Sequence, residues 1–160
     1  TINTKVVSNQ LNGVDWTKEN EFHLFTFFFS DTGGYRFYVN DTGIFYSTES
    51  TIDISGATLT IGAIANESRT ILENFWYGYI DEVRLWNTPL ADSTIQFQFQ
   101  HPSKFGNYYR YTYYDSLIAL WRFNLEKPQS IIEDESEFNN HGTIYTKRGY
   151  SIELSKYGAK

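Results

Sequence analysis

The segment GYIDEVRLWN, residues 78–87, carries the strongest fold signal in the sequence. Its polar and apolar side chains alternate, so a β-strand would place Asp81, Val83 and Leu85 on one face. Aromatic residues lead directly into it, and the whole pattern predicts a long strand over residues 75–86. One face of that strand is apolar and ends in a carboxylate, which needs a hydrogen-bond donor or a cation wherever it is buried.

The rest of the chain also favours strands over helices. Residues 21–29 (EFHLFTFFF) form an apolar run of strand length that ends at turn residues 31–34. The alternating residues 35–40 then lead through a turn at 41–43 into residues 44–46, which is the pattern of a hairpin. Further strands are predicted at residues 58–62, 96–100, 117–123, 143–145 and 150–154, with loops at 63–74 and 127–140.

Helix is predicted only at residues 87–93, where capping residues flank Pro89 and a turn or two is expected. Aromatic residues, which favour strands, make up 19% of the chain. Many short strands separated by turns, with almost no helix, predict an all-β sandwich or jelly roll. A length of 160 residues suits one domain with its own core.

Composition excludes several classes of partner. The chain has 13 Lys and Arg against 19 Asp and Glu, a net charge of −6, and its cations are not clustered. Nucleic acid and anionic membrane surfaces are therefore not expected as partners. Apolar runs of about 18 residues, which span a bilayer, do not occur, so we expect no membrane insertion. The absence of cysteine excludes disulfides and thiol chemistry.

Three segments resemble the laminin-G-like jelly-roll modules of the concanavalin A-like superfamily. The first is residues 78–90, in which Ile-Asp-Glu-Val-Arg is similar to the closing strand of these modules. The second is the strand pair over residues 22–40, and the third joins residues 118–123 to Asp134 and residues 139–144. The resemblance implies a concanavalin A-like sandwich of antiparallel sheets.

The order of these segments leaves two accounts of the domain organisation. A segment like residues 118–123 opens a typical module, whereas here it follows the segment that closes one. Either the chain is a slice across two modules with a break near 101–116, or residues 1–160 form one sandwich. In one sandwich the first and last strands are neighbours. We therefore expect Leu120, Trp121 and Phe123 in one strand that pairs with, or packs over, residues 80–86.

The acidic residues do not form a catalytic pattern. A glycosidase needs an acid and a nucleophile that flank the scissile bond, and the predicted strands do not carry alternating carboxylates. The acidic run at residues 133–137 lies in a predicted loop and is typical of a solvated surface. The histidines are scattered, and no nucleophile elbow occurs. We predict that the chain is not an enzyme.

Aromatic residues in loops and on open strands are the candidates for ligand binding, because their rings stack on sugars. The candidates are Trp76, Tyr77, Tyr109, Tyr111 and Tyr113. Packing in the core is the alternative for each of them. Asn40 and Asn66 begin Asn-x-Ser/Thr patterns and are glycosylation acceptors if the source is a secreted eukaryotic protein.

The resemblance also implies a structural calcium ion, because related sandwiches hold calcium with an Asp at the place that matches Asp81. Asp134 is the second candidate ligand. Calcium takes several oxygen ligands, including backbone carbonyls. The alternative for Asp81 is a cage of backbone hydrogen bonds or an arginine partner.

These observations predict a non-catalytic recognition or adhesion module, extracellular or at the cell surface, that binds a glycan or a protein ligand. The alternative is a structural module that is packed between neighbouring domains of a large assembly or surface protein and has no small ligand.

Overall fold

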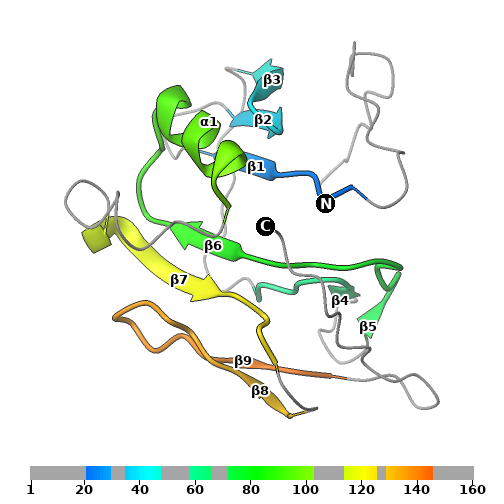
Figure 1. Ribbon diagram of the computed structural model, residues 1–160. Coiled ribbons are helices and arrows are strands. Elements are labelled where there is room, and N and C mark those ends of the chain that lie inside the picture. The colour runs from blue at the N-terminus through cyan, green and yellow to red at the C-terminus, as the bar shows by residue number, and fades with distance from the viewer. Residues whose placement is uncertain are drawn as a thin grey trace. The chain divides into compact units, whose positions relative to one another are not determined.

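Figure 1 shows the computed structural model, which describes residues 21–29, 35–47, 58–65, 72–102, 114–125 and 129–145. The chain divides into two compact units. The first unit combines Thr1–Ile54 with Leu90–Gln100, and the second combines Ser55–Pro89 with His101–Lys160. Among the described residues, no helix has the length and hydropathy that crossing a membrane requires.

The first unit contains a three-stranded antiparallel sheet in the order β1-β2-β3. The strands are β1 (Phe25–Phe29), β2 (Tyr35–Val39) and β3 (Thr42–Ser47). They confirm the predicted hairpin, but its turn lies at Asn40 and Asp41 rather than at residues 41–43. Thr42 already pairs with Val39, so the connection is two residues long and needs an unusual backbone conformation.

Asn40 supplies that conformation. Its φ of +59° lies in the left-handed region, which asparagine tolerates better than most residues do. Its backbone N–H donates to the Leu24 carbonyl oxygen at 2.7 Å, and its Oδ1 accepts the Leu24 N–H at 3.1 Å. Its Nδ2 lies 3.4 Å from His23 Nδ1. The amide predicted as a glycosylation acceptor therefore also fastens the residues before β1 to the turn, and its glycosylation stays a prediction.

We expect Asn40→Ala to lower the free energy of unfolding by about 2 kcal/mol, because it removes the acceptor for Leu24 and places alanine in the left-handed region. Asn40→Gly is the matched control, since it loses the same hydrogen bonds but accepts a positive φ. Its loss should be smaller by about 1 kcal/mol. Urea denaturation followed by tryptophan fluorescence measures both values. Equal losses would contradict the left-handed geometry.

Helix α1 (Asp92–Gln100) also belongs to the first unit. The Tyr38 hydroxyl donates to Asp92 Oδ1 at 2.9 Å, and this bond ties the first turn of the helix to β2. A carboxylate in the first turn also interacts favourably with the helix dipole. The helix begins near the end of the predicted segment 87–93 and is longer than the turn or two expected there.

The strand predicted at residues 96–100 is wrong, because this segment is helical. Its alternating Gln and Phe residues have the period of a strand, but the buried residues of α1 are Thr94, Ile95 and Gln98. Their spacing of three and four residues is that of one helix face. Burial of this face, with Ile95 only 1% exposed, outweighs the local pattern.

The second unit confirms the pairing predicted between the two segments of the family pattern. Strand β6 (Val83–Trp86) pairs antiparallel with β7 (Leu117–Trp121), and Figure 1 shows them side by side in green and yellow. Leu120 and Trp121 lie in β7 as predicted, whereas Phe123 follows the strand with a φ of +55°. The choice between one sandwich and a slice of two modules stays a prediction.

Strand β6 is shorter than the strand predicted over residues 75–86. Glu82 has a φ of +53°, and this left-handed residue ends the regular strand geometry just before Val83. Residues 75–82 are therefore an irregular segment rather than the first half of a long strand.

Two short strand pairs complete the described part of the second unit. They are β4 (Ile64–Ala65) with β5 (Leu72–Glu73), and β8 (Ile131–Ile132) with β9 (Gly142–Thr143). The strand predicted at residues 58–62 is wrong, since β4 begins after Gly62, whose φ is +76°. Strand β8 lies within the predicted loop 127–140. A 3₁₀ turn, Tyr114–Ser116, leads into β7.

A buried cluster of Ala119, Trp121 and Ile132 forms a core in the second unit. The partly buried side chains packed against it are Val83, Leu85, Phe123, Leu125 and Ile144. Val83 and Leu85 thus face the core, as their alternation predicted. The described residues form mostly antiparallel strands in several sheets with one short α-helix, which agrees with the predicted all-β class.

Candidate ligand-binding groove

A groove of about 510 Å³ opens in the second unit. It is lined by residues 62–64 and 74–77 together with Ile80. The Trp76 N–H donates to the Gly62 carbonyl oxygen at 2.8 Å, and Ile64 pairs with Glu73 across β4 and β5. Two segments separated in sequence by residues 65–73 are thereby joined into one concave surface.

Glycine is required where these segments meet. Gly62 has a φ of +76°, and a β-carbon on it would lie 3.2 Å from Ile80 Cδ1. A β-carbon on Gly78 would lie only 2.8 Å from Trp76 Nε1. Because real β-carbons do not approach other atoms so closely, the Trp76 indole can occupy its place only while residue 78 has no side chain.

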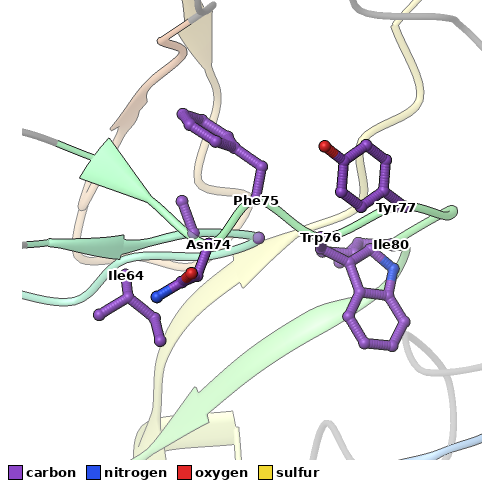
Figure 2. A pocket seen from close by; sticks show the side chains of 8 residues that line it. Ile64, Asn74, Phe75, Trp76, Tyr77 and Ile80 are labelled. Carbon is purple, nitrogen blue, oxygen red and sulfur yellow. The ribbon is translucent and has the colours of Figure 1, made fainter.

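Both described aromatic candidates line this groove, and both are exposed: Trp76 by 57% and Tyr77 by 85%. Their side chains leave the backbone in opposite directions. Figure 2 shows Trp76 and Asn74 on one side of the local backbone, and Phe75 and Tyr77 on the other. Alternation of this kind is what an extended backbone imposes. The candidates Tyr109, Tyr111 and Tyr113, and the acceptor Asn66, lie outside the described residues.

The Asp134 carboxylate is enclosed by hydrogen-bond donors. Its Oδ1 accepts the N–H groups of Leu120 and Ser136, both at 2.8 Å. Its Oδ2 accepts the Ser136 hydroxyl at 2.7 Å and the Asn140 N–H at 2.8 Å. Burial by itself would raise the pKa of Asp134, but these hydrogen bonds together hold it below its ordinary value.

This donor set fits a bare carboxylate better than a calcium ligand, because a carboxylate has about four lone-pair positions and the four donors occupy them. Asp81, the first calcium candidate, is partly buried and accepts the Glu82 N–H at 2.9 Å on Oδ1. Among the described residues, no three His, Asp or Glu side chains are grouped as metal ligands. Calcium at Asp81 stays a prediction.

A buried ionic network lies beside the β6–β7 pair and was missed by the sequence reasoning. Glu82 Oε2 lies 2.6 Å from Arg84 Nη2, and Glu82 Oε1 lies 3.2 Å from Arg122 Nη1. Arg122 Nε reaches Glu135 Oε2 at 2.9 Å. Arg84 Nη2 also donates to the Pro102 carbonyl oxygen at 2.7 Å. The only sequence signal was the i, i+2 spacing of Glu82 and Arg84.

Burial has the largest effect on the pKa values of Glu82 and Arg84. It raises the pKa of Glu82 above its ordinary value, although Arg84 and Arg122 act in the opposite direction. Burial likewise lowers the pKa of Arg84, against the attraction of Glu82. Two described acidic side chains thus have shifted pKa values. Glu82 is paired with arginines, whereas Asp134 accepts hydrogen bonds from backbone amides and a hydroxyl.

Comparison with known families supports the resemblance. A laminin-G-type family model, described as the concanavalin A-like lectin/glucanases superfamily, matches residues 2–96, which is more than half of the chain. The match includes the strand pair 22–40 and the closing segment 78–90, and it ends before residues 118–123. No curated protein and no solved structure matches the chain. The chain therefore belongs to the concanavalin A-like lectin/glucanase superfamily.

Proposed function

We propose that this chain is a non-catalytic recognition module, placed outside the cell or at its surface, that binds a glycan in the groove at residues 62–64 and 74–77. The observation that carries the proposal is the half-exposed Trp76 indole inside a concave, apolar surface. Sugar rings present apolar C–H faces that stack on such indoles. Family membership supports a binding role, because modules of this type are generally non-catalytic.

The carboxylates support the non-catalytic part of the proposal. Retaining and inverting glycosidases use a pair of carboxylates that reach the substrate on either side of the scissile bond. The buried carboxylates described here are committed to other partners, Glu82 to two arginines and Asp134 to backbone and hydroxyl donors. The groove itself is lined by uncharged residues among those described.

A glycan array probed with the wild-type chain and with Trp76→Ala tests the proposal. We expect wild type to bind a subset of glycans and Trp76→Ala to lose about tenfold or more in affinity, since covering an aromatic side chain is worth about 1.5–3 kcal/mol. Tyr79→Ala is the control, because Tyr79 is similarly exposed at 59% but does not line the groove. Binding that ignores the Trp76 change would remove the groove from the function.

A second candidate is the structural module packed against a neighbouring protein. Exposed apolar side chains support it, because large apolar patches mark sites of protein contact. Ile64, which lines the groove, is one of them, and those next to the groove in sequence are Leu59, Ile61 and Tyr79. Light scattering separates the candidates: a monomer that binds glycan supports recognition, and association that Ile64→Ser abolishes supports structural packing.

A further inference from the structure

The Trp76 indole is held from one side. A β-carbon on Gly78 would lie 2.8 Å from Nε1, 3.5 Å from Cε2 and 3.6 Å from Cδ1 of the indole, so the N–H edge of the ring lies close to the Gly78 backbone. The side chain is still 57% exposed. An aromatic ring whose edge lies against the backbone while much of its surface is in solvent is preorganised, and a ligand that stacks on it loses little affinity to ordering the ring.

Asn74 lies on the same side of the backbone as this ring (Figure 2). It is exposed, and its φ of +51° means that the backbone at Asn74 departs from regular strand geometry. A carboxamide carries both a hydrogen-bond donor and an acceptor, which suits the adjacent hydroxyl groups of a sugar ring. Tyr77 also lines the groove but leaves the backbone on the side opposite to Trp76 and Asn74.

The charges of the groove and of the whole chain decide between neutral and acidic sugars as the ligand. The described lining of the groove is uncharged, and the whole chain has a net charge of −6. An acidic sugar would be repelled by the chain and would meet no cation in the groove. A neutral sugar meets neither problem.

We propose that the Gly78 backbone and the Trp76 indole form a fixed, one-sided stacking platform which, with Asn74, takes a neutral pyranose. Gly78 is a positioning residue in this proposal, since it acts through Trp76. The proposal rests on the glycan-binding function proposed above and names the ligand class and the residues for that function.

Calorimetric titration with neutral oligosaccharides of glucose, mannose, galactose and xylose, and with acidic oligogalacturonate and sulfated oligosaccharides, tests the ligand class. We expect binding to one or more neutral probes and none to the acidic ones. Tighter binding of an acidic probe would overturn the neutral class while leaving glycan recognition intact. Binding of no probe of either kind would overturn both the platform and the glycan-binding function.

A double-mutant cycle with the best neutral probe tests the platform. We expect Gly78→Ala and Trp76→Ala each to lose about tenfold in affinity, and the double variant to lose no more than Trp76→Ala alone, because Gly78 acts only through the indole. Gly78→Ala should also change the near-ultraviolet circular dichroism, and only when Trp76 is present. Additive losses, or a Tyr77→Ala loss as large as that of Trp76→Ala, would overturn the one-sided platform. Melting temperatures close to wild type confirm that each variant is folded.

Discussion

Asp134→Ala is expected to lower the free energy of unfolding by about 3–5 kcal/mol, because removing a buried, charged acceptor leaves several buried donors without a partner. Asp134 is only 6% exposed, and its loss leaves the N–H groups of Leu120, Ser136 and Asn140 without their acceptor. These donors come from β7 and from the loop after β8, so the change also frees the loop from the edge of the strand.

The loop covers β7 through further bonds that share this anchor. The Glu135 N–H donates to the Leu120 carbonyl oxygen at 2.9 Å, and Asn140 Nδ2 donates to the Ile118 carbonyl oxygen at 2.6 Å. Strand β7 is thus paired with β6 on one edge and covered by the loop on the other. Without Asp134, that second edge is expected to open and to exchange its amide hydrogens faster.

Glu133→Ala is the matched control, because Glu133 is exposed and next to Asp134 in the same loop. Its effect should stay within about 0.5 kcal/mol. Urea denaturation measures all three proteins, and hydrogen exchange at Leu120 reports the edge directly. Similar stabilities for the two variants would show that the hydrogen bonds to Asp134 contribute little.

The pH dependence follows from the lowered pKa of Asp134. A carboxyl whose pKa is lower in the folded state stabilises that state at pH values above its unfolded pKa, which is ordinarily 3.8. This stabilisation is lost as the pH falls through the folded value. Asp134→Asn cannot titrate, so its stability should fall less than that of wild type on acidification below that point.

The strands with clear patterns could be predicted from sequence, and those decided by distant contacts could not. The apolar run of β1 and the alternation of β2 identified both strands. Residues 96–100 are helical because one face of α1 is buried, and the Tyr38 hydroxyl, 54 residues away in sequence, is bonded to Asp92 in the first turn. A period-two pattern such as Gln-Phe-Gln-Phe-Gln carries no record of that contact.

The candidate site, too, could be predicted from the sequence only in part. The aromatic character of Trp76 and Tyr77 was visible in the sequence, and their opposite directions are those of an extended backbone, whereas the groove forms only where residues 62–64 meet this segment. Asp134 was identified only through the family resemblance, as the second candidate for a calcium ligand. Its donors come from residues 120, 136 and 140, and only folding brings them together.

Glu82→Leu is expected to lower the free energy of unfolding by about 3 kcal/mol, because it removes both the acceptor oxygens and the counter-charge of two arginines. The side chains of Arg84 and Glu82 are 5% and 10% exposed, so water replaces little of what is lost. Leucine has a similar volume and the same difficulty with a positive φ, so the loss reports the missing carboxylate. Glu135→Gln is the surface control: the Glu135 side chain is 49% exposed, and its pair with Arg122 should contribute no more than about 1 kcal/mol.

Glu82→Gln separates the charge of Glu82 from its role as an acceptor. Burial raises the pKa of Glu82 although the two arginines act in the opposite direction, so its charge is not favoured in the folded state. A neutral amide, which keeps one acceptor oxygen, should therefore be tolerated far better than leucine. The sign of the pH effect is opposite to that of Asp134. A carboxyl with a raised pKa contributes its full stability below the unfolded value, ordinarily 4.5, and loses it as the pH rises through the folded value. Stability measured from pH 4 to pH 8 should therefore fall in wild type relative to Glu82→Gln across that window. A wild type that gains on the glutamine variant as the pH rises would mean that the arginine pairs outweigh burial.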